Sequence, residues 1–95
     1  MVVKSYDICF CENKAKVMIS KGAEILSVGV RKKFEFGRFY EVPFLVVKQE
    51  EEKETEEISL SLFSVTEPIE VKAWQYYLGT IALDNGTSTY IVIAG

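Results

Sequence analysis

The sequence predicts an all-β domain of about seven short antiparallel strands, arranged in a sandwich or a small, partly open barrel. Three observations indicate this class. Apolar and polar residues alternate with a period of two along most of the chain, no segment has a helical period, and Asn85-Gly86 is a dipeptide that type I′ hairpin turns favour. Residues 1–95 are expected to form one domain, because a chain of this length has room for only one core.

The first two strands are expected at residues 6–10 and 15–19, where inward apolar residues alternate with outward ones. Between them, Glu12, Asn13 and Lys14 supply turn residues. This arrangement predicts a hairpin whose two strands share one inward face.

The next two strands are expected at residues 26–30 and 38–49. The first would point Leu26, Val28 and Val30 inward, leaving its other face to small residues. The second contains Pro43, which has no N–H to donate to a ladder. It is therefore expected to be an edge strand or to carry a bulge at that point.

A glutamate-rich loop is expected at residues 50–57, where six glutamates face one lysine. A half-buried strand follows from residue 58, and the doublet Leu62-Phe63 interrupts its alternation, which predicts a bulge. Residues 69–75 are ambiguous between loop and a single helical turn.

The last hairpin is expected to join residues 76–83 to residues 87–94 through Asn85-Gly86. Residues 90–93 are apolar on both faces of their strand. That pattern predicts a central strand or one that lies at an oligomer interface.

Several functional classes conflict with the composition. A net charge of −3 and a pI of about 5.0 argue against long nucleic acids and anionic membrane surfaces as partners. There is no apolar run of about 20 residues to span a bilayer, and no signal-peptide pattern follows Met1. The expected location is therefore the cytoplasm.

Catalytic and metal-binding residues are also scarce. The chain has no histidine, which removes histidine-based triads and the commonest metal ligand. Cys9 and Cys11 are too few to close a zinc site, and we expect two small buried thiols in a reducing compartment. We expect neither an enzyme nor a protein with a metal or other cofactor.

Positive charge and aromatic side chains gather in residues 31–40. Residues 1–48 carry nine Lys and Arg against five Asp and Glu, whereas residues 49–95 carry two against nine. Cations can hold phosphate oxygens and aromatic rings can stack on bases, so this segment is a candidate site for an anionic nucleotide. The candidate ligand-binding residues are Arg31, Lys32, Lys33, Phe36, Arg38, Tyr40 and Trp74.

Other interpretations of the same residues remain open. A basic hairpin tip can simply be solvated, it can bind a protein, and Phe34, Phe36 and Phe39 can belong to the core. A second aromatic cluster, Trp74 with Tyr76 and Tyr77, is expected in the core, with a stacking wall or an interface anchor as the alternative.

Three segments resemble a family of small phage-associated proteins of unknown function. They are residues 21–28 (KGAEILSV), Pro68-Ile69 and residues 77–81 (YLGTI). In that family histidines often precede the proline and occur in the last strand, and this chain has none. The resemblance implies a phage or prophage origin and a small all-β unit.

The resemblance also suggests a role, because phages use small non-enzymatic proteins to blunt host immunity. One such class sequesters nucleotide signals as homo-oligomers. We therefore expect an anti-defence protein that binds a cyclic nucleotide or an ADP-ribose derivative in the host cytoplasm. The alternative is a protein–protein module that inhibits a host enzyme or serves a phage assembly. A mean hydropathy of +0.11 in so small a domain further predicts a symmetric homo-oligomer.

Overall fold

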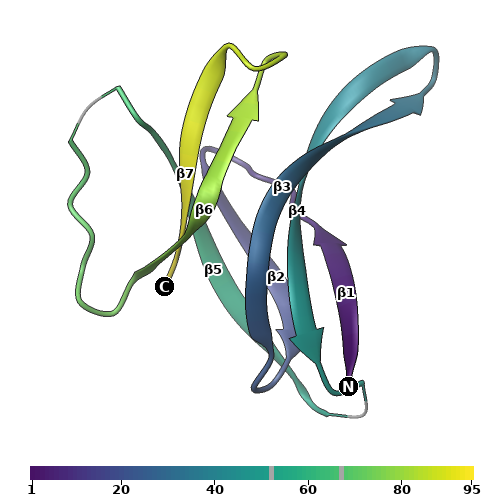
Figure 1. Ribbon diagram of the computed structural model, residues 1–95, viewed down its shortest axis with the longest axis vertical. Coiled ribbons are helices and arrows are strands. Elements are labelled where there is room, and N and C mark those ends of the chain that lie inside the picture. Colours follow the sequence, from purple (N-terminus) through teal and green to yellow (C-terminus); the bar gives the residue numbers. More distant parts are fainter. Residues whose placement is uncertain (52, 67) are drawn as a thin grey trace.

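The computed structural model describes residues 1–51, 53–66 and 68–95. It is all-β, as expected, with seven antiparallel strands and no helix among these residues (Figure 1). The strands are β1 (Val2–Asp7), β2 (Lys14–Ser20), β3 (Glu24–Glu35), β4 (Arg38–Gln49), β5 (Thr55–Ser64), β6 (Tyr76–Leu83) and β7 (Ser88–Ala94).

The strands form two sheets that do not close into a barrel. One has the order β1-β4-β3 and the other the order β2-β5-β7-β6. The predicted hairpin between the first two strands is wrong, because β1 pairs with β4 and β2 pairs with β5. Its turn does form: Cys11 and Lys14 exchange backbone hydrogen bonds around Glu12 and Asn13, both of which have positive φ.

The core lies between the two sheets. Ile8 is 3% exposed and marks where the chain leaves one sheet for the other. The largest fully buried side chains come from both sheets and are Ile19, Leu45, Val47, Leu60, Val92 and Ile93.

The terminal strand β7 is central in its sheet, between β5 and β6, so that half of the prediction for residues 90–93 is confirmed. Val92 and Ile93 are almost completely buried within the chain. These two side chains are therefore part of the core.

The prediction of an edge strand is wrong for residues 44–49, because β4 lies there between β1 and β3. Nor does β4 carry a bulge at Pro43, since Val30 and Pro43 pair in regular register. β1 ends its pairing at Asp7 opposite Phe44, and the Ile8 N–H then donates to the Pro43 carbonyl at 2.8 Å. The proline stands where β4 changes from a central to an edge strand.

The bulges fall at other places than expected. β5 keeps a regular register through Leu62 and Phe63. One irregularity lies between Ile25 and Ser27, and it turns Leu26 outward, contrary to the predicted inward face. The other lies between Tyr77 and Gly79 in β6.

β3 and β6 are the facing edges of the two sheets, and they pack together without a ladder between them among the described residues. A Cβ atom on Gly79 would lie only 2.5 Å from a methyl carbon of Val28. The missing side chain of Gly79 thus lets the two sheets approach each other.

The hairpin between β6 and β7 forms where Asn85-Gly86 predicts it. Asp84, Asn85 and Gly86 have φ of 55°, 58° and 84°, and Leu83 pairs with Ser88 across a four-residue loop. The first hydrogen-bonded turn is centred on Asp84 and Asn85, one residue earlier than the dipeptide suggested.

The two long connections contain no helix in their described residues. The glutamate-rich loop is shorter than expected, because Glu56 and Glu57 already belong to β5, and Glu52 lies outside the described residues. A turn from Lys72 to Gln75 replaces the possible helical turn. The described residues include no helix that could cross a membrane.

Candidate functional site

The β3–β4 hairpin carries most of the candidate residues, and its tip extends away from the rest of the molecule (Figure 1). Glu35 pairs with Arg38 across the two-residue turn Phe36-Gly37. Both turn residues have positive φ, at 52° and 75°, as a type I′ turn requires. The turn places Phe36 at the outermost point, where its side chain is 95% exposed.

The hairpin divides the candidate residues between two faces. Directly opposite residues point the same way and neighbours along a strand alternate. Register pairs Lys33 with Tyr40 and Glu35 with Arg38, and these residues share the outer face with Arg31. Lys32 pairs with Glu41 and Phe34 with Phe39 on the opposite face. The four cations of the hairpin therefore do not converge on one point, because Lys32 lies on the face opposite Arg31, Lys33 and Arg38.

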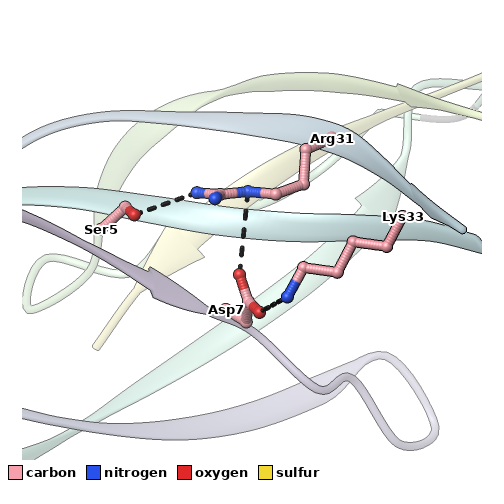
Figure 2. Close-up of polar contacts among 4 residues, drawn as sticks. All are labelled: Ser5, Asp7, Arg31 and Lys33. Carbon is pink, nitrogen blue, oxygen red and sulfur yellow. Dashed lines mark hydrogen bonds and ion pairs between the residues drawn. The ribbon is translucent and has the colours of Figure 1, made fainter. Parts of the chain in front are cut away.

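Two of those cations are held by a carboxylate on the neighbouring strand. Figure 2 shows Asp7 of β1 between Arg31 and Lys33 of β3. Lys33 donates a short hydrogen bond to Asp7, and Arg31 Nε lies 3.8 Å from the other carboxylate oxygen. Arg31 also donates to Ser5 Oγ at 3.0 Å.

This network changes the acidity of Asp7. The hydrogen bond from Lys33 holds the pKa of Asp7 below its ordinary value of 3.8. Desolvation of the carboxylate opposes the effect, while the positive charges of Lys33 and Arg31 add to it. Asp7 therefore stays ionised, and it engages two of the four cations.

Arg31 is fixed from a third direction by an aromatic ring. Its guanidinium carbon lies 4.2 Å from the centre of the Phe44 ring, in cation–π contact. The ring in turn lies against Gly29, where an added Cβ would come within 2.7 Å of it. Arg31 thus belongs to an ordered stack across three strands.

Lys32 connects the hairpin to the other sheet. Its Nζ donates to Asn85 Oδ1 at 3.1 Å, and the Asn85 N–H donates to the Glu41 carboxylate at 3.3 Å. Asn85 therefore braces one face of the hairpin from the β6–β7 loop.

The aromatic residues of the hairpin are exposed, so the interpretation that places them in the core is wrong. Phe34 is 63% exposed and Phe39 is 74% exposed, and their ring centres are 4.9 Å apart. We call these two residues, together with Phe36 in the turn, the hairpin tip (Phe34, Phe36 and Phe39). Exposed aromatic clusters of this kind mark interaction sites.

An open groove of about 530 Å³ lies along β4 and extends to Phe36 of the hairpin tip. Its lining is mostly apolar, and its charged residues are three carboxylates and one lysine. We call it the edge groove. It is lined by Asp7, Ile8, Cys9, Phe10, Lys33, Glu35, Phe36, Tyr40, Glu41, Val42, Pro43, Leu62 and Leu83.

The edge groove borders a free strand edge. In the described part of the chain, β4 pairs only with β3 between Arg38 and Val42, because β1 has ended. The Pro43 carbonyl points toward Ile8. Backbone polar groups alternate sides along a strand, so those of Phe39 and Glu41 point to the same open edge.

The second aromatic cluster lies outside the edge groove. Trp74 is 70% exposed, and Tyr76 and Tyr77 are 53% and 58% exposed, so their expected place in the core is wrong. Trp74 lies in the turn before β6 and does not line the groove that contains Lys33, Phe36 and Tyr40.

Cys9 and Cys11 are free and exposed, contrary to the expectation of buried thiols. The chain at this point crosses between the sheets, and Cys9 faces the edge groove. No group of three or more Cys, Asp or Glu side chains is placed to hold a metal ion in the residues described.

Of the thirteen residues that line the edge groove, the sequence identified only Lys33, Phe36 and Tyr40 as candidates. Ile8, Cys9 and Phe10 enter it because β1 stops at Asp7, and Leu62 and Leu83 reach it from the other sheet. The one signal in the sequence for this open edge was Pro43, because a proline has no N–H to donate to a neighbouring strand such as β1.

No family model, no curated protein and no solved structure matches this chain. The resemblance to phage-associated proteins therefore stays a prediction.

Proposed function

We propose that this chain is a non-enzymatic protein-binding module whose binding element is the β3–β4 hairpin. The observation that carries the proposal is the hairpin tip, where Phe34, Phe36 and Phe39 are 63%, 95% and 74% exposed and Phe36 also lines the edge groove. Exposed aromatic surface is costly in water unless a partner covers it. In the phage context that the resemblance implies, the partner would be a host enzyme or a phage assembly protein in the host cytoplasm.

The charge of the edge groove favours a protein segment over a polyanion. Asp7, Glu35 and Glu41 contribute three negative charges, and Lys33, the one cation in the lining, is hydrogen-bonded to Asp7. A segment with apolar side chains and a Lys or Arg is complementary to this lining. The free edge of β4 offers backbone groups to such a segment in extended conformation, the mode known as strand addition.

Sequestration of an anionic nucleotide signal is the second candidate function. It is supported by the presence of Lys33, Phe36 and Tyr40 in one groove, since a cation and two rings can hold a phosphate and stack on a base. Arg38 lies exposed on the same face of the hairpin as Lys33. The three carboxylates of the groove oppose this candidate.

A peptide selection tests the protein-binding proposal. The immobilised protein is used to select from a random peptide library, and we expect apolar peptides with at least one Lys or Arg to be enriched. Phe36→Ser should lose the enrichment, because Phe36 supplies both tip and groove surface. Leu26→Ser, at a residue 47% exposed on the same hairpin but away from the tip, is the matched control. Absence of enrichment with wild type would overturn the proposal.

A ligand-release experiment tests the second candidate. The protein is incubated with cyclic dinucleotides, cyclic trinucleotides and cyclic ADP-ribose isomers, purified and heat-denatured, and the released compounds are analysed. Intact ligand from wild type, and none from Lys33→Ala, supports sequestration. Degraded ligand contradicts a non-enzymatic role, and the absence of any bound compound removes the nucleotide candidate.

A further inference from the structure

We infer that the free edge of β4 pairs with the same edge of a second copy, antiparallel, with Phe39 opposite Phe39 on a two-fold axis. This inference rests on the proposed function and names the first protein partner of the hairpin. It starts from the five residues Arg38–Val42, which have a neighbouring strand on one side only in the described chain.

The edge lacks the usual protection against such pairing. Natural edges are blunted by prolines, bulges or inward-pointing charges. Here Pro43 lies just beyond the free stretch, and no register shift occurs between Arg38 and Val42. Arg38 and Glu41 give this stretch no net charge, so two copies do not repel each other along it.

The alternation of backbone groups limits the register. Phe39 and Glu41 are the residues whose N–H and C=O groups point outward, so both must lie at hydrogen-bonded positions of the pairing with the second copy. Centring the axis on Phe39 places the copy's Phe36 opposite Val42, where the free edge ends. Centring it one position further along, with Tyr40 opposite Tyr40, would drive the copy's Phe36 against Asp7, which already pairs with Phe44.

In this register the exposed side chains of the hairpin complement one another. On one face Phe39 meets its copy, and each is already in contact with Phe34, so four phenylalanine rings gather around the axis. On the other face Arg38 stands opposite the copy's Tyr40, a cation beside an aromatic ring. Phe36 of each copy reaches the apolar edge groove of the other at Val42.

The arrangement is closed and symmetric, as most homodimers are, and it places no like charges directly opposite. It gives the exposed Phe36 and Phe39 side chains new neighbours in the second copy, and it joins the Phe34–Phe39 pairs of the two copies into one row. Lys33 and Arg38 share one face of each hairpin, so the same contact brings the Lys33 and Arg38 side chains of two copies onto one continuous face.

Sedimentation velocity over a concentration series tests the dimer. Wild type is expected to shift from monomer to dimer as concentration rises. Phe39→Lys puts two positive charges against each other at the axis, and should weaken association by more than about tenfold. Leu26→Lys, exposed on the same hairpin, should associate as wild type does. Folding of both variants is checked by circular dichroism. A wild type that stays monomeric throughout overturns the inference.

Disulfide trapping tests the register. In a background with Cys9→Ser and Cys11→Ser, chains with Arg38→Cys are mixed with chains with Tyr40→Cys. These positions form a non-hydrogen-bonded pair with Cα atoms about 4.5 Å apart, which is within disulfide range. We expect rapid cross-linking of the mixture and none of Tyr40→Cys alone. Cross-linking of Tyr40→Cys alone, or no cross-linking of the mixture, contradicts the register.

The peptide selection separates the two ideas. A monomeric protein that still enriches apolar peptides overturns the second copy as partner and leaves the proposed function standing. A monomeric protein that enriches none overturns both.

Discussion

At the scale of single residues, Asp7 ties the three strands of one sheet together. It lies on β1, and the cations that it holds lie on β3, with β4 between them. Its pKa is lowered chiefly by the hydrogen bond from Lys33. A carboxyl group whose pKa is lower in the folded state stabilises the fold above its unfolded pKa, and this stabilisation is lost as pH falls.

We therefore expect Asp7 to contribute to acid sensitivity. The melting temperature of wild type should fall as pH drops from about 5 to about 2. Asp7→Asn removes both ion pairs, so it should melt lower at neutral pH and should lose less stability on acidification. Glu24→Gln is the control, because Glu24 lies on β3 of the same sheet and has no ion pair in the described structure. Parallel pH profiles for wild type and Asp7→Asn would contradict this role.

Gln49 is the other residue whose role is clear at this scale. It is 3% exposed, its side-chain oxygen accepts the Ser20 N–H at 3.2 Å, and its amide donates to the Tyr6 hydroxyl at 2.6 Å. It thus links the ends of strands from both sheets.

Gln49→Met keeps the shape of the side chain and leaves the Ser20 N–H and the Tyr6 hydroxyl without their partner. We expect the free energy of unfolding to fall by about 1–3 kcal/mol. Chemical denaturation measures it. In the Tyr6→Phe background the loss should be smaller, because one of the two partners is already gone. Equal losses in both backgrounds would show that the pair is not coupled.

At the scale of elements, the contact of β3 with β6 depends on Gly79. Its absent side chain makes room for Val28, whose branched methyl carbon is 2.5 Å from the position of an added Cβ. Gly79→Ala should reduce the free energy of unfolding by about 1–3 kcal/mol through overpacking. Val28→Ala in the same chain should recover part of that loss. No recovery would indicate that the cost arises elsewhere in β6.

The conformation of the β6–β7 loop depends on the backbone of Asn85. Asn85 has a φ of 58°, which proline cannot adopt, and its N–H donates to the Glu41 carboxylate. Asn85→Pro should therefore destabilise the protein by more than about 1 kcal/mol in chemical denaturation. Asn85→Gly, which accepts the same φ, should cost much less. Similar costs for both would mean that positive φ is not what this position requires.

Individual elements show how far sequence reasoning reaches. The bounds predicted for β6 are those of the structure, and Asn85-Gly86 located the β6–β7 hairpin to within one residue, because both signals are local. Which strands pair is not local: β1 and β2 adjoin in sequence, yet the chain crosses between sheets at Ile8. The bulge after Ile25 likewise reversed the face of Leu26, which a regular period of two cannot anticipate.

At the scale of the whole molecule, the sequence located the hairpin of the candidate site and not its surroundings. Residues 31–40 form a projecting hairpin, and Lys33, Phe36 and Tyr40 face one groove. The partners of those residues come from distant segments, above all Asp7, whose charge engages Arg31 and Lys33. The number of cations can be read from the sequence, but only the fold shows which of them already pair with a carboxylate.

Amide hydrogen exchange at Phe39 tests the central claim, that the β4 edge of the hairpin binds a protein segment, most directly. In dilute protein the Phe39 N–H faces the open edge and should exchange fast, whereas the Tyr40 N–H faces β3 and should be slow. Raising the protein concentration, or adding a selected peptide, should slow exchange at Phe39 and leave Tyr40 unchanged. Fast exchange at Phe39 under both conditions would contradict the account.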